Sequence, residues 1–336
     1  MQQPWLFPWQ LSSDGHDVEF VTMSRCAFDA HTFHDRTHLA GRVLVQQRMT
    51  LPEVSAYCSE NLDGLPPARY IFHHAFSCST LLARCLGRLG AAFIYREPAA
   101  LTELALIDID DREFLNTEGG RTMFQAIAQL HRRTEFVGEQ PVVKGCDLLT
   151  GIIERLLALA PGTRGLLLYS DMEPFVLACL KGESRREWMR NRVPLVLRWG
   201  AANPIGTQLQ GMSDGELAAC LWGTHMKIFK DLENRCGDRV LPLDCEALLT
   251  RPTRTLHEVA EFLGLPVEVT RGRAGLRQVH AKTGAPYSAA RRTAELLEMR
   301  ARWPHELSRA RNYCNAIGLP ENGASFFIRP DAEMRS

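Results

Sequence analysis

A short loop of small, polar residues lies between an apolar, β-prone run at 70–74 and a helical pattern at 80–90. It contains Ser77, Cys78, Ser79 and Thr80. The unpaired N–H groups and the dipole at the start of a helix favour a bound anion, and small side chains let a phosphate approach the backbone. A helix cap formed by Ser77 or Ser79 explains the same residues without any ligand. The segment contains no G-x-x-x-x-G-K-S/T motif, so it differs from the P-loop of nucleoside-triphosphate enzymes.

Charged residues stand at the ends of two further strand-like runs, and each has a chemical and a structural interpretation. Glu97 follows the run at 91–95, where a carboxylate can take a proton from a nucleophile or, alternatively, precede a proline-initiated helix as a surface or capping group. Lys144 ends the run at 141–144, and a lysine that ends a buried strand must find an anion or reach water at the sheet edge. Arg96 is a second candidate cation, or the partner of Glu97 in a local ion pair.

Five strand-like runs alternate with helical patterns and would position these residues. They lie at 70–74, 91–95, 141–144, 164–170 and 239–244. This alternation predicts a three-layer α/β fold, in which helices cover both faces of a mostly parallel central sheet of about five strands, followed by a helical C-terminal part. Such sheets bind ligands beyond the carboxyl ends of their strands, where the loop at 77–80, Glu97, Lys144 and Ser170 stand. Asp171 is placed to cap the next helix.

A Gly-Leu-Pro-Pro cluster at 64–67 predicts a domain boundary, because glycine and proline interrupt regular structure. We expect an N-terminal addition over 1–66, with a strand-like run at 18–21 and a role that the sequence does not indicate. An α/β domain over 67–318 and a C-terminal tail over 319–336 follow.

The composition of the 336-residue chain excludes several classes of protein. Its 39 Lys and Arg balance 39 Asp and Glu, which does not support a non-specific nucleic-acid binder, and a hydrophobic fraction of 45% excludes wholesale disorder. The N-terminus has no signal-peptide pattern, and no apolar run is long enough to span a bilayer. The ten cysteines include no C-x-x-C pair. We therefore expect a cytoplasmic protein with reduced, mostly buried thiols, no metal site, no membrane partner and no nucleic-acid partner; the oligomeric state is not indicated.

Two segments resemble parts of the sulfotransferase family. Residues 70–98, YIFHHAFSCSTLLARCLGRLGAAFIYREP, resemble its opening strand, its loop of type Pro-Lys/Arg-Ser-Gly-Thr-Thr, and a strand that ends in Glu-Pro. Residues 243–266, LDCEALLTRPTRTLHEVAEFLGLP, resemble a later segment that closes on Phe-Leu-Gly-Leu. Between them, LLLYSDMEPFVLACL at 166–180 stands where the family binds the 3′-phosphate of its donor. The resemblance spans about 68–318 and implies a P-loop-type, sulfotransferase-like fold.

The resemblance implies a donor, 3′-phosphoadenosine-5′-phosphosulfate, and roles for individual residues. Residues 76–80, which are Phe76 and the loop of small residues, would hold the 5′-phosphosulfate, and Glu97 would be the general base. Phe76 stands where the family has a lysine or arginine, and Cys78 where it has glycine. Ser170 and Cys179 stand near the usual arginine and serine of the 3′-phosphate site. Lys144 and Arg96 are the candidates to replace the missing charge.

Two basic segments offer further candidates. The first, 184–198, contains Arg185, Arg186, Arg190, Arg192 and Arg198; it is either a solvated helix face or a site for the 3′-phosphate or an acidic substrate. The second, 271–311, includes Lys282 and Arg291. The family closes a late basic loop over the nucleotide, and an exposed basic helix is the alternative explanation. His73, His74 and Trp222 are expected in the core.

These observations predict transfer of a sulfuryl group from the nucleotide donor to a hydroxyl or amine of a small metabolite or saccharide. A first alternative is a P-loop-derived phosphotransferase that uses Lys144 in place of the loop lysine. A second alternative is a catalytically inactive pseudo-sulfotransferase that binds a nucleotide or a partner.

Overall fold

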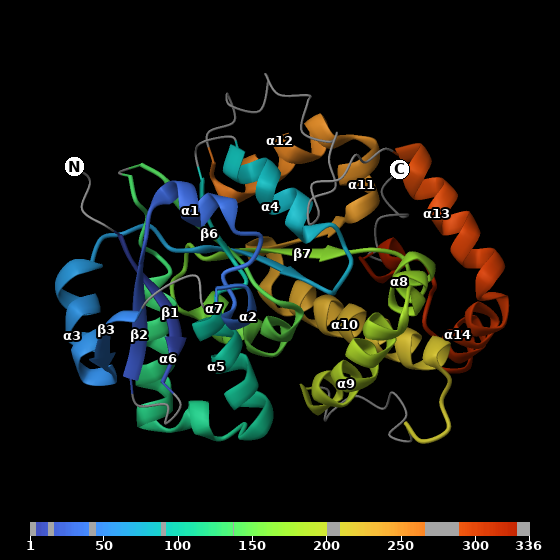
Figure 1. Ribbon diagram of the computed structural model, residues 1–336, viewed down its shortest axis with the longest axis horizontal. Helices are drawn as coiled ribbons and strands as arrows, with labels where there is room; N and C mark the ends of the chain where they lie inside the picture. The colour runs from blue at the N-terminus through green and yellow to red at the C-terminus, as the bar shows by residue number, and fades with distance from the viewer. Residues whose placement is uncertain are drawn as a thin grey trace. The chain divides into compact units, whose positions relative to one another are not determined.

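The computed structural model describes residues 5–12, 17–39, 45–88, 92–136, 138–199, 209–265 and 289–327 (Figure 1). The chain divides into two compact units. Unit 1 contains the described residues of 1–72, 79–165 and 256–273, and unit 2 contains those of 73–78, 166–255 and 274–336. Among all the residues that the structure describes, none of the helices combines the length and the apolar character needed to cross a membrane.

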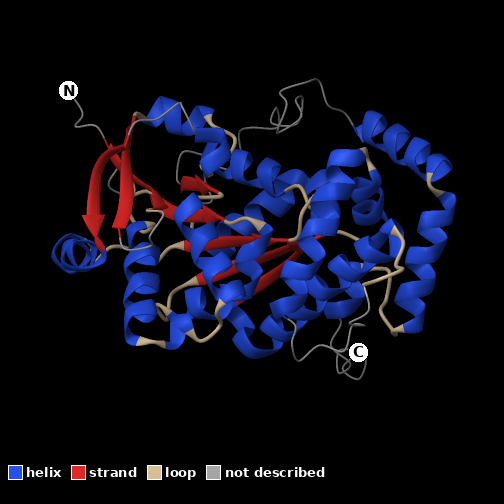
Figure 2. Ribbon diagram, turned by 60° about the horizontal axis from the view of Figure 1, so that its bottom comes forward, coloured by secondary structure: helices blue, strands red, loops and turns tan. Residues whose placement is uncertain are grey.

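A five-stranded parallel sheet, with strand order β5-β6-β4-β7-β8, forms the centre of the α/β fold. Its strands are β4 (Arg69–His73), β5 (Ala92–Arg96), β6 (Gln140–Lys144), β7 (Arg164–Tyr169) and β8 (Val240–Asp244). Apart from the first residues of β4, β6 and β7, every residue of β4 to β7 is buried, as expected for parallel strands that are covered on both faces. Figure 2 shows these strands in red among the helices. The predicted fold class is confirmed.

The three strands of unit 1 bring three carboxyl ends to one edge of the sheet. Lys144 on β6 is in register with Ile71 on β4 and with Arg96 on β5, and both pairs are parallel. Helix α4 (Ser79–Arg88) packs against β5 and β6 with Leu82 and Leu86 buried. A Cβ on its Gly87 would lie only 3.3 Å from Ile94, so glycine allows this close approach.

The N-terminal part of unit 1 holds a second, antiparallel sheet of order β1-β2-β3. Its strands are β1 (Trp5–Leu11), β2 (Asp17–Met23) and β3 (Val45–Thr50). The strand-like run at 18–21 lies within β2, whereas the sequence did not indicate β1 and β3. The reason is visible in their residues: β1 contains Pro8, and β3 reads VQQRMT without an alternating apolar pattern.

This second sheet and its helices share the core of unit 1. The helices of the unit are α1 (Arg25–Ala30), α2 (Arg36–Leu39), α3 (Leu51–Asn61), α4, α5 (Ala99–Asp110), α6 (Glu118–Leu130) and α7 (Ile153–Ala158), with 3-10 turns at Phe114–Asn116 and Asp147–Ile152. Strand β1 packs against α5, and the Leu11 N–H donates to Glu103 Oε2 at 2.6 Å. Helix α3 packs against α6.

Unit 2 is built around α10 (Asp214–Cys236), which begins with a capping box between Ser213 and Glu216. Helices α8 (Met172–Leu180), α9 (Glu183–Trp199) and α14 (Pro304–Ala316) pack against it. The remaining helices are α11 (Cys245–Thr250), α12 (Pro252–Leu263), which ends in unit 1, and α13 (Ala289–Arg302), with 3-10 turns at Gly237–Arg239 and Gly323–Phe327. Trp222 on α10 is fully buried, so its predicted place in the core is confirmed.

Helix α8 begins after Asp171, as the sequence predicts, but the carboxylate does not cap it. Asp171 Oδ1 instead accepts a hydrogen bond from the Gly323 N–H at 2.8 Å. Asp171 therefore fixes the Gly323–Phe327 turn to the end of β7. A Cβ on Gly323 would come within 2.6 Å of the Tyr169 ring, so this position requires glycine.

Candidate functional site

The loop after β4 contains two residues in the left-handed region of backbone space. Phe76 has φ of 64° and Cys78 has φ of 62°. Each costs an L-residue about 1–2 kcal/mol, so the surrounding structure must hold them in place. Cys78 stands where the sulfotransferase loop has glycine, the residue that adopts this φ without cost. Its thiol hydrogen-bonds with the thiol of Cys245, and this bond raises the pKa of Cys245 well above its usual value.

Hydrogen bonds within unit 2 hold this loop. The Ser77 hydroxyl donates to the His74 carbonyl at 2.8 Å, and the Ser170 N–H donates to His74 Nε2 at 2.8 Å. Because Nε2 accepts, Nδ1 carries the proton and donates to the Ala75 carbonyl at 2.8 Å. The Trp222 indole N–H donates to the Ser170 carbonyl, also at 2.8 Å. This arrangement requires a neutral imidazole, and burial lowers the pKa of His74 to about 4.

These bonds also define where two predicted donor-binding residues lie. Ser77 is fully buried, and its hydroxyl is used within the loop. Ser170 is buried as well, and its hydroxyl donates to the Asp171 carbonyl at 3.3 Å. Both therefore position the loop backbone, and a direct contact of either side chain with the donor stays a prediction. Cys179 on α8 is fully buried.

Ser79 and Thr80 are the first two residues of α4 and are buried. The N–H groups in the first turn of a helix have no partner within that helix. In unit 1 this helix start follows β4 at the edge where β5 and β6 also end. The predicted anion-binding backbone and the predicted catalytic residues thus belong to the same edge of the sheet.

Lys144 and Glu97 form a buried ion pair at that edge. Lys144 Nζ binds Glu97 Oε1, and the two side chains are 2% and 21% exposed. The Glu97 N–H donates to the Lys144 carbonyl at 2.7 Å, and Glu97 is a third residue with positive φ, 53°. Lys144 Nζ also lies 5.0 Å from the centre of the Phe33 ring. The anion that the buried Lys144 requires is therefore the carboxylate of Glu97.

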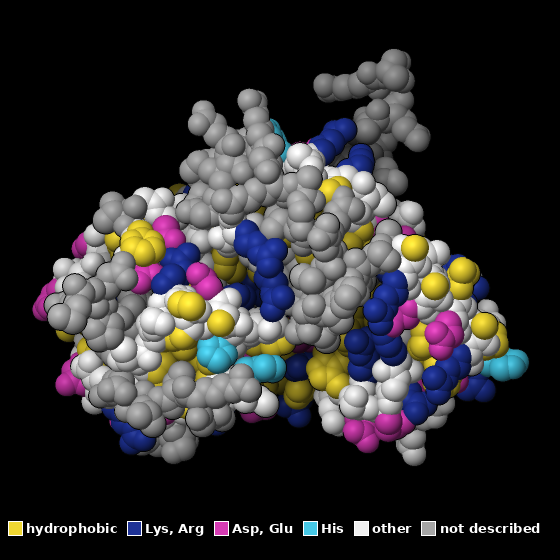
Figure 3. All heavy atoms as spheres, turned by 45° about the horizontal axis from the view of Figure 1, so that its top comes forward, with side chains coloured by type: hydrophobic (Ala, Val, Ile, Leu, Met, Phe, Trp, Pro, Cys, Tyr) yellow, Lys and Arg dark blue, Asp and Glu magenta, His cyan; other side chains and the backbone are white. Residues whose placement is uncertain are grey.

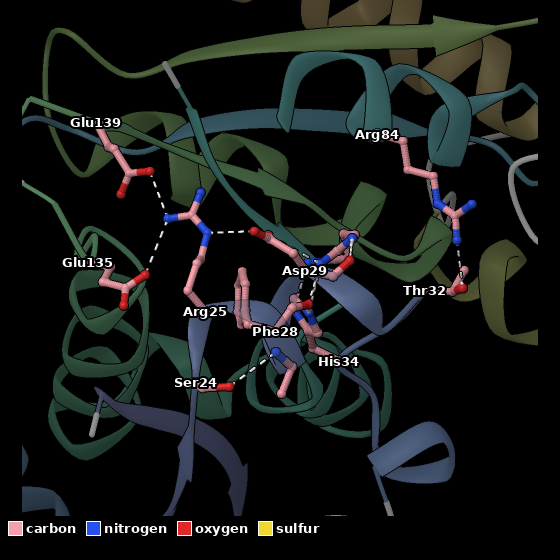
Figure 4. Close-up of polar contacts among 11 residues, drawn as sticks. Ser24, Arg25, Phe28, Asp29, Thr32, His34, Arg84, Glu135 and Glu139 are labelled. Atoms are coloured by element: carbon pink, nitrogen blue, oxygen red, sulfur yellow. Dashed lines mark hydrogen bonds and ion pairs between the residues drawn. The ribbon is translucent and has the colours of Figure 1, made fainter. Parts of the chain in front are cut away.

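Arg96, the other candidate cation, is directed into the N-terminal part of unit 1. Its Nη1 donates to the Asp29 carbonyl at 3.0 Å, and its Nη2 donates to the Phe28 carbonyl. Its N–H donates to His34 Nδ1 at 3.1 Å. Figure 4 shows Phe28, Asp29 and His34 together near the end of α1. Arg96 thus binds the last carbonyls of a helix rather than Glu97. Burial lowers its pKa to about 10.

The two late basic candidates are Lys282 and Arg291. Lys282 lies outside the described residues. Arg291 is exposed on α13. The pKa of Glu295 is lowered mainly by its hydrogen bond with Lys181, and the charge of Arg291 lowers it further. In the same region, Arg300 and Arg311 both pair with Glu173. Figure 3 shows basic and acidic side chains interleaved on the side where α13 and α14 lie.

Arg185 on α9 is one of the arginines of the basic segment 184–198, and the structure shows a contact with Phe76 that the sequence did not indicate. Its guanidinium carbon lies 4.7 Å from the centre of the Phe76 ring, and Nη1 donates to the Ala178 carbonyl at 3.0 Å. Trp188 packs edge-on against Phe76 at 5.3 Å, and Arg192 lies 5.4 Å from Trp188. The spacing of 185, 188 and 192 places these side chains on one helix face, which was the available signal.

Comparisons with solved structures give distant matches, three of which are described here. No family model matches the chain, and no curated protein does. A sulfotransferase domain from the curacin biosynthetic pathway is 14% identical, with a TM-score of 0.44, over 76% of this chain and 99% of its own. A sulfotransferase from Alicyclobacillus acidocaldarius is 13% identical, with a TM-score of 0.40, over 78% and 99%. One from Mycobacterium avium is 11% identical, with a TM-score of 0.37, over 80% and 82%.

All three solved structures come from the family that the sequence resembles.

Proposed function

We propose that this chain is a sulfotransferase-like enzyme that moves a sulfuryl group from 3′-phosphoadenosine-5′-phosphosulfate to a hydroxyl or amine of a small metabolite or saccharide. The observation that carries this proposal is the buried Lys144–Glu97 pair, which lies at the sheet edge where α4 begins. A carboxylate held beside a helix start that favours anions supplies a base and an anion site, the two parts that transfer to a hydroxyl requires.

The donor would be held by main-chain N–H groups at the start of α4. Ser79 and Thr80 provide the first N–H groups of the helix, and Cys78 precedes them with a left-handed backbone. Turns that contain left-handed residues can direct successive N–H groups into one concave anion site. The loop residues therefore fit a phosphosulfate, whose sulfuryl group is the one to be transferred.

Glu97 would be the general base and Lys144 the residue that holds it. Oε1 of the carboxylate is bound to Lys144, and no described residue hydrogen-bonds Oε2. The acceptor O–H or N–H would donate its proton to Oε2 as the acceptor atom attacks sulfur. The bond between sulfur and the bridging phosphate oxygen breaks, and adenosine 3′,5′-bisphosphate leaves. Lys144 adds positive charge at the edge where the leaving oxygens carry negative charge.

Nucleotide binding tests this proposal against its two alternatives. Adenosine 3′,5′-bisphosphate in EDTA is expected to raise the melting temperature of the protein, because a ligand that binds only the folded state stabilises it. If ATP with Mg²⁺ raises the melting temperature and the bisphosphate does not, the result would instead favour the phosphotransferase. The third outcome is that the protein binds the bisphosphate but transfers no ³⁵S label from the donor to any acceptor in a broad screen. That outcome would favour the inactive binding protein.

A further inference from the structure

The anion loop lacks a cation of its own, because Phe76 occupies the position where the resembled loop has lysine or arginine. In unit 2, the ring of Phe76 carries a guanidinium group on its surface, that of Arg185, at 4.7 Å. The positive charge that the loop itself lacks is thus present beside the loop, on Arg185 of α9.

The guanidinium is held in place at two points. The Phe76 ring supports it by a cation–π contact, and the Ala178 carbonyl near the end of α8 accepts a hydrogen bond from Nη1. Trp188 fixes the Phe76 ring from the side. A side chain ordered in this way loses little further entropy when it binds a ligand.

Arg185 forms no ion pair with a described carboxylate, although Glu295 is near enough to attract its charge. Among the described residues, no Asp or Glu oxygen lies within ion-pair distance of its guanidinium, whereas Arg186 and Arg190 on the same helix both pair with Glu183. A guanidinium has five N–H donors, and one of them is used on Ala178. The group is half-buried, so burial lowers its pKa, yet arginine remains charged under physiological conditions.

We infer that Arg185 is the cation of the donor site: its guanidinium, positioned on the Phe76 ring, binds the 5′-phosphosulfate of the nucleotide in place of a loop lysine. This inference rests on the proposed function. The 3′-phosphate is the other anionic group of the same donor, and the 5′ end is favoured because Phe76 belongs to the loop that leads into α4.

The test compares Arg185→Gln with Arg186→Gln by calorimetric titration. Glutamine keeps a hydrogen-bond donor for Ala178 but removes the charge, and Arg186 is a matched control because it is half-buried on the same helix and stacks on Trp303 at 5.1 Å instead of Phe76. Arg185→Gln is expected to weaken adenosine 3′,5′-bisphosphate binding by about tenfold or more, the value of a lost charged hydrogen bond. Arg186→Gln is expected to leave the affinity unchanged.

Two further arms decide which phosphate is bound and whether charge is the cause. Adenosine 3′-monophosphate lacks the 5′ group, so its affinity is expected to be equal in the wild type and in Arg185→Gln. The double variant Phe76→Lys/Arg185→Gln restores a cation from within the loop and is expected to recover the bisphosphate affinity.

Equal bisphosphate affinity in the wild type and in Arg185→Gln would overturn the inference while leaving the proposed function intact. A matching loss of 3′-monophosphate affinity would overturn it in favour of the 3′-phosphate. If the wild type binds no bisphosphate, the proposed function fails, and this inference fails with it.

Discussion

Glu97→Gln is expected to lower the rate of sulfuryl transfer by about 10²–10⁴-fold, because an amide cannot accept the proton that a general base removes. The affinity for adenosine 3′,5′-bisphosphate is expected to stay nearly unchanged, since the proposed donor contacts are main-chain groups and Arg185. Turnover is measured with ³⁵S-labelled donor and an acceptor found by screening, and affinity by calorimetry. If transfer continues at the wild-type rate in Glu97→Gln, Glu97 is not the base.

The same substitution has a structural consequence that a second variant isolates. Glu97→Gln leaves Lys144 buried without its carboxylate, which is expected to destabilise the protein by about 2 kcal/mol. This is less than the roughly 3–5 kcal/mol typical of fully buried pairs, because Glu97 is 21% exposed. Urea unfolding measures the loss, and the double variant Glu97→Gln/Lys144→Met is expected to recover most of it. No recovery would show that the pair does not account for the loss.

Stability is expected to fall steeply as the pH drops from about 6.5 towards about 4, because several buried histidines must remain neutral in the folded protein. Burial lowers the pKa of His74 to about 4 and that of His131 to about 4, from an ordinary value of 6.5. Burial also holds the pKa values of His34 and His225 well below that value. The folded-state pKa lies below the unfolded one, so the unfolded chain binds more protons in this range and is favoured there.

The size of this effect follows from the lowered pKa values of His74 and His131. Between about pH 7.5 and about pH 5, His74 and His131 are each expected to remove about 2 kcal/mol of unfolding free energy. Urea unfolding at a series of pH values measures the slope. His131→Leu is expected to reduce the loss of unfolding free energy over that pH range by about 2 kcal/mol. His305→Gln, at an exposed position, is expected to leave that loss unchanged. A slope that His131→Leu does not alter would contradict this assignment.

The five strands of the central sheet could be predicted because each is a short apolar run bounded on at least one side by glycine, proline or a charged residue. The N-terminal sheet could not, because β3 is mostly polar and its pairing with β2 is a tertiary contact. Trp222 could be placed in the core from its helical context, and its burial confirms this.

The site residues divide in the same way. Lys144 and Glu97 could be singled out individually from their positions at strand ends. Their pairing follows from the register of Arg96 with Lys144, which no local pattern indicates. Arg96 donates hydrogen bonds to carbonyls of α1. The sequence does not show where this N-terminal helix packs. Arg185 could be named from the sequence only as one of five arginines in 184–198, and its contact with Phe76 depends on tertiary packing that no local pattern indicates.

The central claim is that the backbone at the start of α4 binds the 5′ end of a bisphosphorylated nucleotide. A crystal structure of the protein grown with adenosine 3′,5′-bisphosphate tests it most directly. We predict that the 5′-phosphate accepts hydrogen bonds from the N–H groups of Ser79 and Thr80. Nucleotide bound elsewhere, or the Phe76 ring filling that position, would contradict the account.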